Sequence, residues 1–276
     1  MFLNAVIIIV QEILEAALLI SVLLVFTYLF QKVWGKSFIL KTSWVAYSIV
    51  LGVIGAALYS HYTGQVSQWF DYVGQEIVNA SIHIISLFLI LLLAFAVPPG
   101  NMSARLVERS RLTTICMIGI VLLAIIREGS EIMLYAGGVA SQPENFTPVV
   151  FGAVIGGGIG VSAGVLLYYG LISLNAKWAF RVCLILLALI SGNMGSQAVL
   201  LLTQADWLPF TPIAWNTSSI LAEASIPGHL LYALIGYEAT PSVLQVGFYL
   251  FGIVMIVLSP LFRKTWSSNH SLVTPV

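Results

Sequence analysis

Charge is what this sequence has least of. Only 8% of its 276 residues are Asp, Glu, Lys or Arg, against about 25% in an average soluble domain. Hydrophobic residues make up 59% of the chain, and so few charged side chains cannot cover them with a polar surface. The composition therefore excludes an ordinary soluble protein and predicts that lipid surrounds much of the chain.

Cysteine is equally scarce, because the chain has only Cys116 and Cys183, both inside apolar segments. We interpret them as small apolar side chains rather than as a disulfide or a metal pair. No Cys/His spacing is typical of a zinc site, and no glycine-rich loop ends in Lys-Ser or Lys-Thr, so nothing indicates ATP as the energy source. The first apolar run lacks a basic leader, which predicts a retained span rather than a cleaved signal.

Long apolar segments are what the sequence has instead. A helix needs about 20 apolar residues to cross a bilayer. The proline-rich stretch 204–241 interrupts these segments, and we interpret it as an outer excursion that holds a short helix near 217–235. The seven predicted spans are 3–30, 41–62, 73–97, 112–140, 147–175, 178–203 and 242–262.

The basic residues indicate how these spans are oriented. In a seven-span arrangement, ten of the eleven Lys and Arg residues fall on one side, and Arg127 alone lies within a span. The positive-inside rule makes that side the cytoplasm and places the N-terminus outside. Six acids gather on the other side, where they either concentrate cations or merely avoid the basic side. The ten basic residues are Lys32, Lys36, Lys41, Arg105, Arg109, Arg111, Lys177, Arg181, Arg263 and Lys264. The six acids are Asp71, Glu76, Glu144, Asp206, Glu223 and Glu238.

The chain also has the organisation of an internal repeat. A Glu-x-x-Glu pair lies in the first span, and a second pair lies in the fourth, so that each opens a group of three spans. The two groups, 1–98 and 112–203, would cross the membrane in opposite directions, as inverted repeats do in many transporters. The predicted fold is a single all-α integral membrane domain of seven transmembrane helices. In it, the two inverted three-helix repeats precede the excursion 204–241 and a final helix, 242–264.

Glycines recur every four residues in the fifth predicted span. They would line one face of a helix and allow another helix to approach it closely. We assign them a packing role and no chemistry. The four are Gly152, Gly156, Gly160 and Gly164.

The two glutamate pairs carry the chemistry. Residues three apart lie on nearly the same helix face, so each pair can point two carboxylates at one place. Each carboxylate costs at least ~2.5 kcal/mol in a membrane, although protonation or pairing with Arg127 would let them serve a purely structural role. Carboxylate oxygens suit hard cations, and we predict a metal site formed by Glu12, Glu15, Glu128 and Glu131. In the empty site some of these carboxyls should bind protons, which metal binding would release.

At this point a family resemblance can be stated. The segment 127–131, Arg-Glu-Gly-Ser-Glu, resembles the Arg-Glu-x-x-Glu motif of the iron permease family, the high-affinity ferric transporters of bacteria and fungi. The segment 11–20 is similar to that family's first-span motif, and 236–242 resembles the stretch before its last span.

The resemblance implies ferric iron as the transported substrate, with no permanently bound cofactor. It implies the four motif glutamates as metal ligands and Glu76 as a further site residue. It also implies a partner outside the cytoplasm that delivers or oxidises iron. The chain would be a multi-pass protein of the cell (inner or plasma) membrane, in contact with the lipid bilayer, with no nucleic acid among its partners.

One departure from the family leaves alternatives open. Gln11 stands where the family's first motif has arginine, and this makes the site one charge more negative. A same-fold transporter of a divalent metal (ferrous iron, manganese or lead) is therefore an alternative. His83 is a secondary ligand candidate, although a lone histidine in a span more often joins helices, and His229 with Glu223 is a candidate for a gate or waiting site.

Two other classes fit less well. A membrane carboxylate-metal enzyme would usually combine Glu with Glu-x-x-His, and neither glutamate pair has a histidine at that spacing. We therefore expect no enzymatic activity. A metal sensor is disfavoured because the sequence offers no cytoplasmic domain to pass on a signal.

Overall fold

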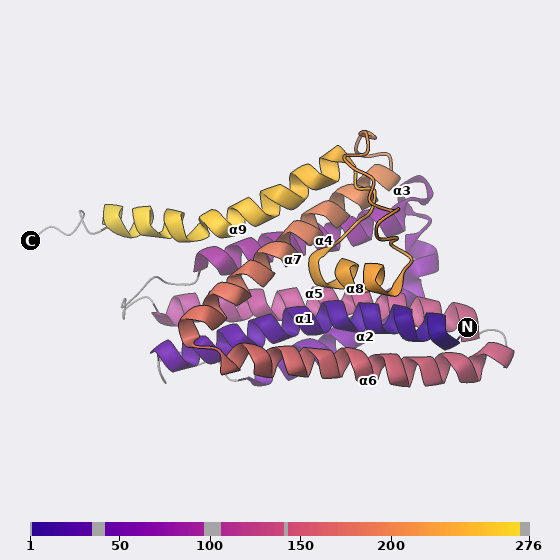
Figure 1. Ribbon diagram of the computed structural model, residues 1–276, viewed down its shortest axis with the longest axis horizontal. Coiled ribbons are helices and arrows are strands. Elements are labelled where there is room, and N and C mark those ends of the chain that lie inside the picture. Colours follow the sequence, from indigo (N-terminus) through magenta and orange to yellow (C-terminus); the bar gives the residue numbers. More distant parts are fainter. Residues whose placement is uncertain (1, 35–41, 97–105, 141–142, 271–276) are drawn as a thin grey trace, which may run out of the picture.

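The computed structural model describes residues 2–34, 42–96, 106–140 and 143–270, and its regular elements are helices, apart from one isolated β-bridge between Ile213 and Ser242. The long helices run side by side as a bundle (Figure 1). This confirms the all-α prediction. In chain order the helices are α1 Phe2–Trp34, α2 Ser43–Val66, α3 Trp69–Tyr72, α4 Gly74–Ala96, α5 Leu106–Ala140, α6 Pro143–Ser173, α7 Ala176–Gln204, α8 Ile226–Ile235 and α9 Val243–His270.

Within the described residues, six helices are long and apolar enough to cross a membrane, namely α1, α2, α4, α5, α6 and α7. They coincide with the first six predicted spans to within a few residues, and they make the chain a multi-pass membrane protein. The apolar part of α9, Val243–Ser259, is shorter. The seventh span and the orientation in the membrane therefore remain predictions.

The helix ends that carry basic residues lie together at one end of the bundle (Figure 1). They are the C-terminal ends of α1 and α9 and the N-terminal ends of α5 and α7, where Lys32, Arg111, Lys177 and Arg181 occur. The positions Lys36, Lys41 and Arg105 lie outside the described residues. The N-terminus of α1 and the start of α6 lie at the opposite end.

The predicted short helix of the excursion is present as α8, but it begins later than residue 217. Ser225 is its N-cap, because the Ser225 hydroxyl accepts a hydrogen bond from the Gly228 amide at 3.1 Å, and Pro227 occupies the first turn. Gly236 ends α8 with φ of 68°, a left-handed conformation that glycine adopts without strain. The side chain of Asn193 lies so close that a β-carbon on Gly236 would be 2.5 Å from its Oδ1.

The parallel packing of α6 on α1 confirms the predicted role of the glycine row. A β-carbon on Gly152 would be 2.7 Å from the Ala5 Cβ, and one on Gly160 would be 2.8 Å from the Ile13 Cγ2. Both helices advance in the same direction along this contact, so they are parallel. The close approach holds the first glutamate pair against α6.

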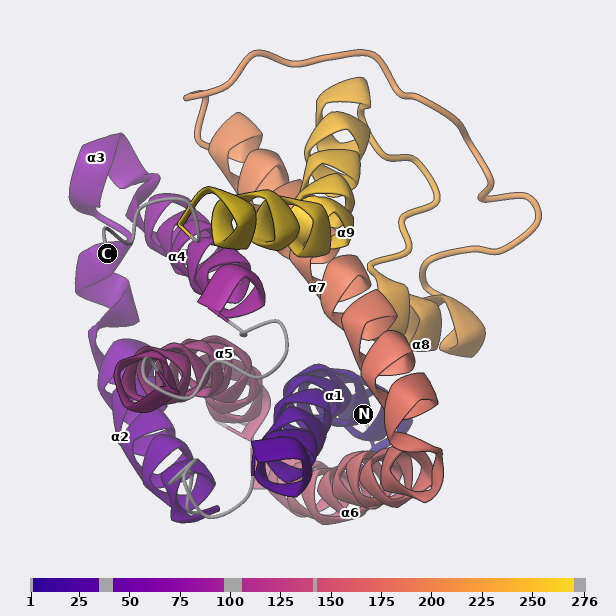
Figure 2. The same cartoon turned by 90° about the vertical axis from the view of Figure 1, so that its left-hand side faces the viewer.

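The second motif helix makes an equivalent contact, in which α5 packs in parallel on α2. A β-carbon on Gly52 would be 2.7 Å from the Ile125 Cβ, and one on Gly129 would be 3.0 Å from the Ala56 Cβ. Seen from the end of the bundle, α1 lies among α5, α6 and α7, while α2 lies outside α5 (Figure 2). Each motif helix thus packs along the second helix of the other predicted repeat.

We predict that Gly156→Ala destabilises the protein, whereas Gly158→Ala does not. The new methyl at position 156 would meet the Val6 carbonyl oxygen at 2.9 Å and Ile9 at 3.2 Å, while the one at 158 meets nothing within 4 Å. Overpacking of this kind costs about 1–3 kcal/mol, and alanine in an open helical position gains up to about 1 kcal/mol. Thermal unfolding of both variants in detergent measures the difference. Equal melting temperatures would show that the α1–α6 contact yields without cost.

Candidate metal centre

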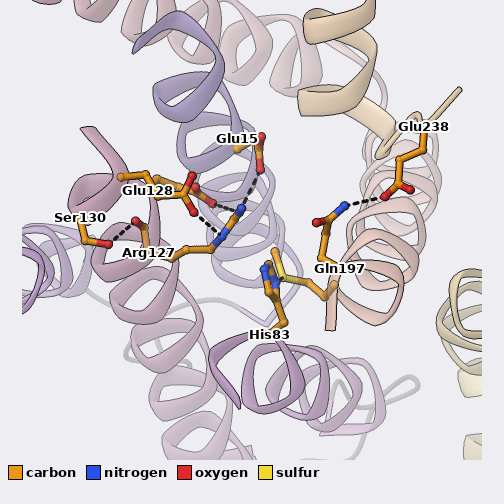
Figure 3. A network of polar contacts seen from close by, with 9 residues as sticks. Glu15, His83, Arg127, Glu128, Ser130, Gln197 and Glu238 are labelled. Atoms are coloured by element: carbon orange, nitrogen blue, oxygen red, sulfur yellow. Dashed lines mark hydrogen bonds and ion pairs between the residues drawn. The ribbon is translucent and has the colours of Figure 1, made fainter. Parts of the chain in front are cut away.

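Arg127 lies at the centre of the predicted site and contacts three carboxylates. Its Nη1 donates to Glu128 Oε1 at 2.8 Å and to Glu15 Oε2 at 3.4 Å, and its Nε lies 3.3 Å from Glu131 Oε1 (Figure 3). The guanidinium is buried, so the pairs are shielded from water and its charge is balanced by the carboxylates around it. Arg127 therefore joins α1 to α5 and fixes the second motif against the first.

Three of the four predicted ligands gather at one point. One carboxylate oxygen each of Glu12, Glu128 and Glu131 lies within 4.8 Å of the other two. Two oxygens bound to one cation at about 2.0–2.6 Å are at most about 5 Å apart, so the spacing suits a single ion. We call these three residues the carboxylate triad.

The triad has unused acceptor capacity. The Oε2 atoms of Glu12 and Glu128 are buried and accept no hydrogen bond from the described residues. A buried acceptor without a donor is costly, and a cation between the carboxylates would supply what is missing. Glu131 is the reachable member, because 37% of its side chain is exposed.

Glu15 stands apart from the triad. Its Oε2 faces Arg127, and its buried Oε1 lacks a hydrogen-bond donor within the described structure. The structure thus brings together all four glutamates predicted from the sequence. Three of them converge on one point, while Glu15 contacts Arg127 without belonging to that group.

The predicted secondary residue Glu76 is connected to the triad indirectly. It lies in the first turn of α4 and is half-buried. The phenol of Tyr59 lies within electrostatic range of both Glu131 and Glu76, and it donates to Asn79 Oδ1 at 3.1 Å. Tyr59 thus lies near both Glu76 and Glu131, and its hydrogen bond goes to Asn79.

Gln11 is held by a residue from α8. Its Oε1 is 2.7 Å from His229 Nδ1, which must donate because an amide oxygen only accepts. Tyr232, three residues further along α8, lies within electrostatic range of Glu15, Arg127 and the α5 glutamates. The two side chains share one face of the helix, so α8 covers the site from the side of the excursion.

A cavity of about 540 Å³ leads to this cover. It lies between α1, α7, the excursion and α9, and it opens to the surface. Charged and polar side chains line much of it, including two of the three acids of the excursion, Glu223 and Glu238. The lining includes Gln11, Glu223, His229, Tyr232, Glu238 and Gln245. The cavity is thus lined both by acids and by Gln11, the neighbour of Glu12.

Comparison with known proteins assigns the chain to a family. The sequence profile of the iron permease FTR1 family matches residues 2–263, nearly the whole chain. The chain belongs to the iron permease FTR1 family. This is a family of permeases and not of enzymes, which agrees with the resemblance stated above.

Curated relatives agree with this assignment. The ferrous iron permease EfeU of Escherichia coli O6:H1 (strain CFT073) is 24% identical over 95% of this chain and 98% of its own length. The protein of the same name from Shigella sonnei is 24% identical over 87% of this chain and 88% of its own. That of Shigella flexneri is 29% identical over 47% of this chain and 55% of its own. No solved structure matches the chain.

Sequence reasoning missed one polar cluster of the permease. Glu238 lies between α8 and α9, and its carboxylate accepts hydrogen bonds from two buried glutamines. Gln197 Nε2 donates to its Oε1 at 2.8 Å, and Gln245 Nε2 donates to its Oε2 at 2.6 Å. Burial raises the pKa of the Glu238 carboxyl, and the nearby Glu223 charge adds to this, while the two amide hydrogen bonds oppose it. The sequence feature that could have revealed this cluster is Ser242-x-x-Gln245. It forms a capping box at the start of α9, and this turns Gln245 back toward the excursion.

Removing this carboxylate should loosen the excursion. We expect Glu238→Ala to destabilise the permease by about 2 kcal/mol, because two buried amides lose their acceptor. Glu144→Ala is the matched control, since Glu144 is exposed in the first turn of α6. Thermal unfolding in detergent compares the two. If both variants melt together, the excursion does not depend on the Glu238 cluster.

Proposed function

We propose that this permease imports ferrous iron through the carboxylate triad of Glu12, Glu128 and Glu131. The observation that carries the proposal is the convergence of three carboxylates from α1 and α5 with buried oxygens that have no donor. The relatives' names, ferrous iron permease, support a divalent ion over the ferric ion expected from the resemblance. The two motif helices would be the moving or lining elements of the pathway.

The charges of the site accommodate either oxidation state. With all four glutamates ionised, Arg127 leaves a net charge of about −3, which would balance a trivalent ion. A divalent ion is balanced when one carboxyl keeps a proton, and crowding of like charges favours that state. Selectivity between Fe²⁺ and Fe³⁺ therefore depends on the protonation of the triad and on any other ligand that the ion meets.

The acid-lined cavity supports an outside-to-inside pathway. It is lined in part by the excursion, which follows the end of α7 opposite its basic start (Figure 1). A negative interior favours entry of a divalent cation by about 4.6 kcal/mol at 100 mV. Uptake then needs no ATP. The cytoplasmic or inner membrane would be the location in which this potential exists.

The helix contacts support the inverted-repeat interpretation. Ile9, three residues before Glu12, packs against Gly156, and Ile125, three residues before Glu128, packs against Gly52. The next contacts, Ile13 with Gly160 and Gly129 with Ala56, keep both spacings. A two-fold axis that exchanges α1 with α5 and α2 with α6 explains this correspondence. The triad would then lie at the repeat interface, where transporters of this type bind their substrates.

Uptake into proteoliposomes tests the proposal. The purified permease would be given Fe²⁺ with ascorbate, or Fe³⁺-citrate without reductant, under an inside-negative potassium diffusion potential. We expect potential-driven Fe²⁺ influx well above that of protein-free vesicles. Faster influx of Fe³⁺ would restore the ferric interpretation, and influx of neither ion would refute the permease assignment for this chain.

A further inference from the structure

His83 of α4 is a buried histidine that the carboxylate triad does not include. Its side chain is about 1% exposed. One ring nitrogen, Nδ1, lies 3.0 Å from the sulfur of Met194 on α7, and the other, Nε2, has no hydrogen-bond partner among the described residues. A buried nitrogen without a hydrogen-bond partner destabilises the folded protein, and a bound ligand would remove this cost.

The methionine fixes which nitrogen carries the proton. A thioether sulfur has no hydrogen and can only accept. In the contact with Met194, Nδ1 of the neutral ring is therefore the donor, and the lone pair is left on Nε2. This tautomer leaves Nε2 able to bind a metal, and the other nitrogen of a metal-binding histidine usually donates a hydrogen bond that fixes the ring.

The ring also lies near the proposed pathway. Figure 3 shows His83 on the side of the site that faces Arg127 and Gln197, and the ring is within electrostatic range of the Arg127 guanidinium. Asn79 and Ser86, four residues before and three after it, are also buried on the same helix face. The polar face of α4 thus lies on the side of the site where Arg127 is.

We propose that His83 Nε2 is a nitrogen ligand for the transported ion and makes the permease favour Fe²⁺ over Mn²⁺, with Met194 as its positioning residue. This inference rests on the proposed function, because it assumes that the ion reaches the triad. The triad supplies hard oxygens that bind many cations. An imidazole adds a donor that binds Fe²⁺ more strongly than Mn²⁺ and that suits Fe²⁺ better than the harder Fe³⁺.

Competitive uptake into proteoliposomes tests the inference. His83→Gln should lower Fe²⁺ influx below saturation by about tenfold and Mn²⁺ influx much less, so that the Fe²⁺/Mn²⁺ ratio falls. Met194→Leu should shift the ratio in the same direction, because the ring loses the acceptor that orients it. Met117→Leu is the matched control, since Met117 is also fully buried but contacts Thr27 instead. Its ratio should equal that of wild type.

A spectroscopic readout separates ligation from packing. Pulsed EPR of the detergent-solubilised permease loaded with Mn²⁺ alone should show ¹⁴N modulation from a bound imidazole, and His83→Gln should abolish it. An unchanged Fe²⁺/Mn²⁺ ratio in His83→Gln, or ¹⁴N modulation that survives the substitution, would overturn the inference. The proposed function fails separately, if Glu12→Gln still transports both ions.

Discussion

Replacing Glu12 with glutamine should lower Fe²⁺ influx by at least about 100-fold, because loss even of an outer-shell partner costs 10–100-fold in metal affinity. The substitution keeps the shape of the side chain but removes a charge from the triad. The fold should survive it, since Glu12 makes no ion pair with Arg127. Initial rates of ⁵⁵Fe uptake into proteoliposomes, normalised to reconstituted protein, measure the effect.

Two further variants make the test specific to the triad. Glu15→Gln should reduce influx less than Glu12→Gln, because Glu15 is not one of the three glutamates whose oxygens converge. Glu144→Gln, at an exposed position, should leave influx unchanged. If the Glu12 and Glu15 variants lost the same amount of influx, the distinction between Glu15 and the triad would be wrong, and all four motif glutamates would count as ligands. Wild-type influx in Glu12→Gln would refute the site.

Arg127→Leu should have the largest effect on stability. It leaves buried carboxylates without their cation, and breaking a buried ion pair from one side costs about 3–5 kcal/mol. Arg127→Lys should recover part of this loss, because it keeps the charge but cannot contact three carboxylates at once. Thermal unfolding in detergent measures the stability of both Arg127 variants. Arg111→Leu is the exposed control, and its stability should lie within about 0.5 kcal/mol of that of wild type.

Added iron provides the counter-test. A cation that binds the folded state stabilises it by mass action, and the Arg127→Leu site offers it one more negative charge. Fe²⁺ should therefore raise the melting temperature of Arg127→Leu by more than it raises that of wild type. If Arg127→Leu melted with wild type and did not respond to Fe²⁺, Arg127 would not be neutralising the buried glutamates.

The long helices were predictable because a helix that crosses a bilayer needs an unbroken apolar segment of about 20 residues. The apolar runs marked α1, α2, α4, α5, α6 and α7 to within a few residues. The short elements were not, because they depend on single contacts. The turn through α3 has three successive residues at positive φ, Phe70, Asp71 and Tyr72, none of them a glycine that would have signalled it.

The site was predictable as a set of residues but not as a geometry. Charged residues in apolar spans are conspicuous candidates for a functional site, and helical spacing pairs Glu12 with Glu15. Spacing gives no information on which carboxylate oxygens converge across the two helices, and this convergence is what separates the triad from Glu15. The contacts of His229 with Gln11 and of Met194 with His83 join residues more than 100 positions apart, so only the folded chain reveals them.

Each motif helix packs on a helix of the other predicted repeat, and this has a consequence for biosynthesis. About 140 residues separate Glu12 from Gly156, so at about 5–20 residues per second the ribosome needs roughly 7–30 s before the partner of α1 is made. Until those segments are made, the first glutamate pair must reside in the bilayer, or wait beside the translocon, first without Arg127 and then without α6. A chain released before this point would leave α1 without the glycine-lined helix that packs along it and Glu15 without the arginine that it contacts.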